Sequence, residues 1–264
     1  MKKDLFSAAY DCLRAESVDD KVNQTQIMAA AWQRGDLSLQ TNMPVEAIHQ
    51  PGRPVKPTLV SAGAVPKRKL GSVEGRAALL HAIAHIEFNA IDLAWDAVYR
   101  FREMPREFYD DWVQVAFEEA YHFGLVHQRL QDTGYQYGDF DAHNGLWDMA
   151  TKTAHDILVR MALVPRFLEA RGLDVTPGII RKLENTGDQA SIDVLQIILR
   201  DEIGHVAIGS RWFGYLCNQR GLVMEASYRQ ILDEYLPDRG FKIELNESAR
   251  LQAGFSKDEL QALK

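Results

Sequence analysis

The chain has 264 residues, of which 46% are hydrophobic and 25% are charged, a composition typical of a globular protein with a buried core. A formal net charge of −7, without any run of five or six like charges, disfavours unaided binding to nucleic acid or to an anionic membrane. The apolar runs are far shorter than the roughly 20 residues of a membrane-spanning helix, and the first residues lack the apolar core of a signal peptide. Two widely separated cysteines indicate a reducing compartment, so we expect a cytoplasmic protein.

The N-terminal part, residues 1–72, divides into two kinds of sequence. Residues 1–34 place apolar side chains at helical spacing and predict two short helices. Between 35 and 72, five of the nine prolines fall within 23 positions, which predicts an extended connector. This connector either wraps the domain that follows and shapes access to a site, or only tethers the N-terminal helices.

Four long helices are predicted in residues 73–220, at about 73–102, 106–132, 147–172 and 188–219. The glycine-rich stretch 133–146, if extended, reaches roughly 45 Å and can run back along a helix of roughly 39 Å, so the second and third helices can lie parallel. Residues 173–187, with Pro177, are predicted to form a climbing link. The expected fold is all-α, a four-helix bundle with one long crossover, followed by a C-terminal helical extension over 221–264.

The second and fourth helices each carry a carboxylate and an imidazole three residues apart, Glu119 with His122 and Glu202 with His205. At this spacing both side chains lie on one helix face and can bind a common ion. A single Glu-x-x-His match is expected by chance in a chain of this composition, and its ordinary interpretation is a solvated surface pair. Two matches on two long helices indicate a site.

The other two helices each offer one glutamate. Glu87 falls within the apolar stripe of the first helix, and Glu169 lies in the third helix at a less regular spacing. For either residue alone, a carboxylate that reaches water from the edge of the stripe is an equally good interpretation. Glu87 and Glu119 lie about equally far from the turn at Met104, which places them at the same height of a hairpin. Together with the two pairs, the glutamates predict a carboxylate-bridged two-metal site.

Two histidines of the first helix, His81 and His85, are four residues apart and share a face that is rotated from Glu87. We expect them to be capped or partly exposed side chains rather than metal ligands.

The complete set of Glu and His residues resembles the ligand set of the ferritin-like di-iron carboxylate superfamily. The segments 84–87, 117–123, 169–174 and 200–205 are similar to an uncharacterised ferritin-like family, the domain of unknown function 455, and the similarity covers about residues 70–220. A more distant similarity is to the tRNA-modifying monooxygenase that hydroxylates an isopentenyl adenosine. The resemblance implies a ferritin-like fold and a metal site, and it does not imply a substrate. The implied metal ligands are Glu87, Glu119, His122, Glu169, Glu202 and His205.

The resemblance also implies a supporting role for two acids that directly precede metal ligands. In the superfamily this position often accepts a hydrogen bond from a ligand histidine, and it corresponds here to Glu118 and Asp201. The alternative is that both are solvent-exposed acids.

Oxygen and nitrogen ligands of this kind suit two metal ions, iron first, with manganese or zinc as alternatives. The leading hypothesis is an O2-dependent oxidoreductase, such as a hydroxylase, that uses an electron donor and a small-molecule or modified-base substrate. The alternatives are a ferroxidase or an iron-handling or iron-sensing protein without an organic substrate, and a metal-free structural or interaction bundle.

Lys67, Arg68 and Lys69 form the only compact basic cluster, which gives limited attraction for a nucleic acid. We expect no membrane partner, and a homodimer is a further option.

Overall fold

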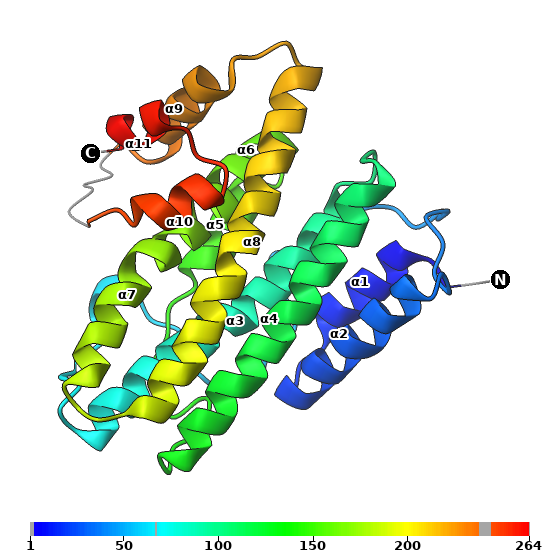
Figure 1. Ribbon diagram of the computed structural model, residues 1–264. Helices are drawn as coiled ribbons and strands as arrows, with labels where there is room; N and C mark the ends of the chain where they lie inside the picture. Colours follow the sequence, from blue (N-terminus) through cyan, green and yellow to red (C-terminus); the bar gives the residue numbers. More distant parts are fainter. Residues whose placement is uncertain (1–2, 67, 238–243, 264) are drawn as a thin grey trace. The chain divides into compact units, whose positions relative to one another are not determined.

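A computed structural model describes the chain except for residues 1–2, 67, 238–243 and 264 and the side chain of residue 262, and the described part is built from helices, with a long connector over residues 35–72 (Figure 1). Within the described part there is no strand, only two isolated backbone bridges. The all-α class predicted from the sequence is thus confirmed. Lys67 of the predicted basic cluster lies outside the described residues. The chain divides into two compact units, residues 1–151 and residues 152–264.

Unit 1 is organised around an antiparallel helical hairpin. Its two long helices are α3 (Val73–Arg100) and α4 (Arg106–Asp132), whose bounds agree with the prediction within two residues. The helix α1 (Leu5–Arg14) packs against α3, and α2 (Val18–Gln33) packs against α4 (Figure 1). Ser72 caps α3 by accepting a hydrogen bond from the amide of Gly75, and Pro105 immediately precedes α4.

Helix α3 is also long and apolar enough to cross a membrane by length and composition alone, the only such helix among the described residues. Of its most apolar window, 72% is buried inside the structure, as in the core helix of a globular protein.

The connector of residues 35–72 is fixed to unit 1 along its length. The amide of Gly52 donates to the carbonyl of Leu13 in α1, and the amide of Val60 donates to the carbonyl of Ala142 in the crossover, at 2.8 Å. The indole of Trp147, in the short helix α5 (Gly145–Lys152), donates to the carbonyl of His49 at 2.9 Å. Of the two roles considered for the connector, these contacts favour wrapping over simple tethering.

Unit 2 contains a second hairpin, whose first arm is a single long helix in three parts. It runs through α6 (Ile157–Leu163), a π-helical turn (Val164–Glu169) and α7 (Ala170–Glu184), and it returns as α8 (Gln189–Gln219). Among the described residues that follow, three helices belong to the same unit, α9 (Met224–Tyr235), α10 (Glu247–Gln252) and α11 (Lys257–Ala262). The division between the units falls inside the predicted bundle 73–220, and the three-part division 1–72, 73–220 and 221–264 stays a prediction.

The third long helix differs from its predicted range of 147–172. It begins only after Asp156, whose carboxylate accepts the amide of Leu158 at 2.7 Å, and it continues to Glu184, while α5 is a separate helix. Residues 173–187, predicted to be a link, are therefore mostly helical. Pro177, which ordinarily ends a helix, lies in the middle of α7.

A contact from far along the chain explains how α7 passes through Pro177. Proline has no amide hydrogen, so the carbonyl four residues earlier, that of Leu173, loses its helical partner. The side-chain amide of Asn246 donates to this carbonyl at 3.1 Å. Local sequence contains no sign of a partner 73 positions away.

The π-helical turn contains Pro165 as its second residue, so the same loss of an amide hydrogen occurs here. A π-helical turn widens the helix locally and changes which residues share a face. Helix α8 approaches the turn closely at Gly209, where an added Cβ would lie 2.5 Å from the Cβ of Pro165. A side chain at position 209 would therefore push the turn away from α8.

Replacing Asn246 tests the role of this side chain in α7. Asn246→Ala removes both the bond to Leu173 and the N-cap of α10, and we expect a loss of about 1–3 kcal/mol in the free energy of unfolding. In a Pro177→Ala background, the new amide at 177 supplies the missing bond, so the cost of Asn246→Ala should fall by about 1 kcal/mol. Urea unfolding of the four proteins measures this coupling, and equal costs in both backgrounds would contradict the explanation.

Candidate metal centre

Unit 1 brings together three of the residues singled out in the sequence. The Nδ1 atom of His122 lies 3.5 Å from a carboxylate oxygen of Glu87 on α3 and 3.6 Å from one of Glu119 on its own helix. All three side chains are buried. Glu87 lies as far before the end of α3 as Glu119 lies after the start of α4, so the hairpin places the two glutamates at one height.

The charge state of His122 follows from these neighbours. Burial alone lowers the pKa of an imidazole, but the carboxylates of Glu119 and Glu87 outweigh it and raise the pKa of His122 to about 11. In the metal-free protein the imidazolium thus balances part of the negative charge of two buried carboxylates. A divalent cation bound to the same three side chains would take over this role.

Helix α3 carries a second buried polar face, which explains His85. Its Nε2 atom lies 3.1 Å from the carbonyl of His143 and 3.2 Å from the side-chain amide nitrogen of Asn89. Its Nδ1 atom lies 2.9 Å from the hydroxyl of Tyr137. Burial lowers the pKa of His85 to about 4, which keeps the ring neutral. His81 accepts from the amide of Gly138 at 2.9 Å, so both histidines are capped as expected, although both are buried rather than exposed.

The same face of α3 continues to an ion pair that the sequence analysis did not identify. Lys21 of α2 is fully buried, contacts the carboxylate of Asp92, and donates to the carbonyls of Cys12 and Leu13 at 3.3 and 3.4 Å. Asp92 lies within the most apolar stretch of α3, and an acid in that position indicates a buried carboxylate that needs a partner. The pair attaches α2 to the core without contributing to the carboxylate–imidazole group.

Unit 2 contains the second carboxylate–imidazole pair. The Nδ1 atom of His205 lies 3.5 Å from a carboxylate oxygen of Glu202 on α8, the histidine being buried and the glutamate half-buried. Glu169 is half-buried at the last position of the π-helical turn. The number of residues from Glu169 to the end of α7 is close to the number from the start of α8 to Glu202. The hairpin of unit 2 therefore places the two glutamates at similar height.

The two acids predicted to support the ligand histidines are both half-buried. Glu118 accepts a hydrogen bond from the side-chain amide of Gln114 at 2.7 Å, and Asp201 pairs with Arg200 at 2.8 Å. Their proposed role toward the histidines stays a prediction.

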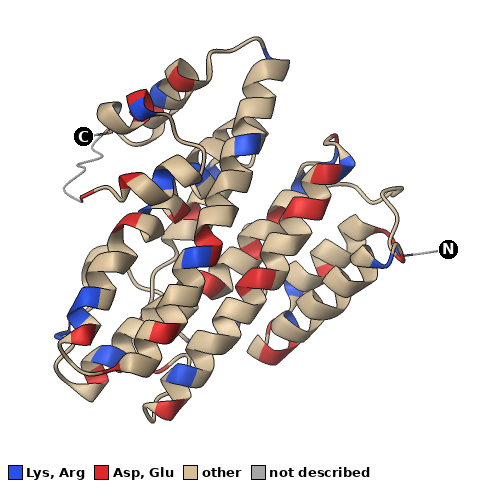
Figure 2. Cartoon of the chain, in the orientation of Figure 1, with Lys and Arg blue, Asp and Glu red and all other residues tan. Residues whose placement is uncertain are grey.

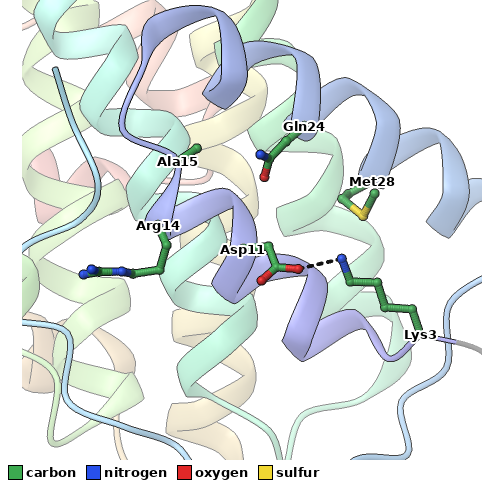
Figure 3. A pocket seen from close by; sticks show the side chains of 6 residues that line it. All are labelled: Lys3, Asp11, Arg14, Ala15, Gln24 and Met28. Carbon is green, nitrogen blue, oxygen red and sulfur yellow. Dashed lines mark hydrogen bonds and ion pairs between the residues drawn. The ribbon is translucent and has the colours of Figure 1, made fainter.

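The remaining charged surface does not form a competing site in the part of the chain that the structure describes. Lys and Arg are spread along the helices rather than collected in one stripe (Figure 2). A surface pocket of about 390 Å³ between α1 and α2 is lined by Lys3 and Asp11, which pair with one another at 2.7 Å, beside Arg14 (Figure 3). The charges of Lys3 and Asp11 compensate each other, and the lining of this pocket contains no carboxylate–imidazole pair.

The fold and these side chains together define the class of protein. It is an all-helical protein with buried and half-buried Glu and His residues that can hold a metal ion, one carboxylate–imidazole pair on a long helix in each unit.

Comparison with known proteins places the chain in a family. A family model described as "Protein of unknown function (DUF455)" matches residues 14–261, and the chain belongs to this family. It is 52% identical over 214 residues to a protein of Haemophilus influenzae named "Uncharacterized protein", an alignment that covers 78% of this chain and 74% of that one. No solved structure matches the chain.

The raised pKa of His122 predicts a pH dependence of stability in the metal-free protein. Because the pKa rises on folding from the ordinary 6.5 to about 11, the stabilisation is complete below pH 6.5 and is lost as the pH rises toward 11. Urea unfolding of the wild type and of His122→Gln at about pH 6 and about pH 9.5 should show that the advantage of the wild type shrinks at the higher pH. An advantage independent of pH would contradict this assignment.

Proposed function

We propose that the protein binds two metal ions, iron first, and catalyses the O2-dependent oxidation of an organic substrate. The observation that carries the proposal is the repetition of one arrangement, an Nδ1 atom 3.5–3.6 Å from the glutamate three residues earlier, on a long helix of each unit. The resemblance of these residues to the ligand set of the ferritin-like superfamily also supports the proposal. The metal ligands would be Glu87, Glu119, His122, Glu169, Glu202 and His205.

The chemistry of the donor atoms supports iron. Carboxylate oxygens and imidazole nitrogens are the ligands of iron and manganese, and zinc accepts the same set, whereas both cysteines are buried away from these residues. Four glutamates balance the charge of two divalent ions. Iron bound by these residues would supply the redox chemistry with dioxygen that the side chains themselves lack.

The residues of the chain have three tasks in this proposal. The glutamates and histidines hold the metal ions and set their spacing, and Glu87 and Glu119 do so from buried positions. His122 gives up its proton when it becomes a ligand, because only the neutral ring can coordinate. Glu118 and Asp201 orient the ligand histidines through hydrogen bonds.

The proposal extends to partners and location. An oxidation that consumes dioxygen at such a site requires an electron donor and a small-molecule or modified-base substrate. The scattered basic residues disfavour a nucleic acid, and the buried surface of α3 disfavours a membrane partner. We place the protein in the cytoplasm because its two cysteines are free, and we retain a homodimer as its assembly.

Metal content tests the site directly. We expect about two ions per chain in protein loaded anaerobically with ferrous iron, and a loss of at least one ion per chain in Glu119→Gln and in Glu202→Gln. Elemental analysis after gel filtration measures this ratio. Glu107→Gln is the matched control, since Glu107 is an exposed glutamate on the same helix as Glu119 and should leave the ratio unchanged.

The outcomes of this measurement separate the competing functions. Absence of stoichiometric metal in the wild type would leave a structural or interaction protein. Metal that is retained equally in the control and in the ligand variants would indicate adventitious binding.

Activity is the second test. Iron-loaded protein supplied with a reductant should consume dioxygen, and products from a library of small molecules and modified nucleosides should carry oxygen from isotopically labelled dioxygen. Glu119→Gln should lower this rate at least about 100-fold, as expected when a redox metal site is no longer assembled. Oxidation of ferrous iron without any organic product would instead indicate a ferroxidase.

A further inference from the structure

The C-terminal segment, residues 246–263, is attached to the α6–π–α7 helix of unit 2 by two buried ion pairs. Arg166 pairs with Glu259, and Arg250 pairs with Asp174. The four side chains are at most 9% exposed, so each pair is removed from water. Buried charges of this kind are costly unless they are paired with good geometry, and these pairs have it.

The first pair holds the π-helical turn itself. The guanidinium of Arg166, inside the turn, donates to both carboxylate oxygens of Glu259 at 2.9 and 3.0 Å and to the hydroxyl of Ser210 at 3.1 Å. The rings of Phe213, Tyr228 and Phe255 surround this guanidinium at 4.4–5.3 Å. The hydroxyl of Tyr228 also donates to the backbone carbonyl of Arg166 at 3.1 Å.

The second pair holds the first turns of α7. Arg250 donates to Asp174 at 2.7 Å and also to the carbonyl of Ala170 at 3.4 Å. Ala170 directly follows Glu169, and Arg166 lies shortly before Glu169 in the same turn. The C-terminal segment thus contacts the backbone or side chains on both sides of Glu169.

We propose that the C-terminal segment fixes the π-helical turn in the conformation that presents Glu169 to the metal centre, with Arg166 and Arg250 as positioning residues. This inference rests on the proposed metal site. Regular helical hydrogen bonding alone does not set this turn, because Pro165 lacks an amide hydrogen. Contacts from outside the helix therefore define its path, namely the close approach of Gly209 in α8 and the two ion pairs.

The substitution Glu259→Gln tests the proposal with little damage to α11. Glu259 also closes a capping box, in which its carboxylate accepts the amide of Ser256 at 2.8 Å, and glutamine can serve the same role. The change therefore removes the charge that pairs with Arg166 and preserves the start of the helix. Ser210→Ala is a milder second variant, which removes only the hydrogen bond to Arg166.

Two measurements follow the turn and the metal separately. Hydrogen exchange of the metal-free protein reports on peptides that cover residues 160–172, where Glu259→Gln should increase exchange and Ser210→Ala should increase it less. Cobalt(II) titration, followed by visible absorption, reports on affinity and ligand geometry. We expect Glu259→Gln to weaken cobalt binding about 10- to 100-fold and to change the spectrum, as for other residues that orient metal ligands.

The matched control is Arg220→Gln. Arg220 forms a bidentate pair with Asp156, at 2.7 Å for both bonds, in the same unit but just beyond the C-terminal end of α8, away from Glu202. Asp156 keeps its own bond to the amide of Leu158, so the loss of Arg220 should leave both the exchange of residues 160–172 and the cobalt spectrum unchanged.

The outcomes distinguish this inference from the proposed function. A wild-type protein that binds no cobalt would remove the metal site, and the exchange data would still show whether the C-terminal segment holds the turn. A wild type that binds cobalt, with Glu259→Gln and Ser210→Ala matching Arg220→Gln in exchange, affinity and spectrum, would overturn the inference. If Glu259→Gln fails to fold, Ser210→Ala alone decides between these results.

Discussion

Ionised side chains inside a helical core must be compensated, and this constraint governs both units of the protein. Lys21 with Asp92 in unit 1, and Arg166 with Glu259 in unit 2, join segments far apart in the sequence through pairs that water does not reach. Each pair replaces hydration by direct hydrogen bonds. The carboxylate–imidazole groups belong to the same class of problem, but their donor atoms are those that bind transition metals.

The two hairpins solve the placement of these groups in the same way. In each, a glutamate on the first arm and a Glu-x-x-His motif on the second lie near mid-length, so a short turn between the arms brings them to one height. Unit 1 achieves this with two uninterrupted helices. Unit 2 requires an arm that passes through two prolines, and its additional contacts with the C-terminal segment are located at those positions.

The parts of the fold that depend on local periodicity could be predicted, and the parts that depend on distant partners could not. Helices α3, α4 and α8 have continuous apolar stripes, and their predicted ranges differ from the structure by two residues at most. The less regular spacing around Glu169 reflects the π-helical turn, since a pattern with 3.6 residues per turn does not describe a widened helix. Pro177 predicted the end of a helix. The prediction was wrong because the side chain of Asn246, far along the chain, supplies the hydrogen bond that the proline cannot make.

The bond from Asn246 to the carbonyl of Leu173 has a consequence for the order of events during synthesis. A chain emerging from the ribosome presents Pro177 long before Asn246, so until residue 246 has been released the carbonyl of Leu173 lacks the partner that it has in the folded protein. The hairpin of unit 1 can close as soon as α4 has emerged, whereas the first arm of the hairpin of unit 2 is completed last. The maturation of unit 2 thus waits for the synthesis of residue 246, and a nascent chain arrested before that residue would carry an unfinished α7.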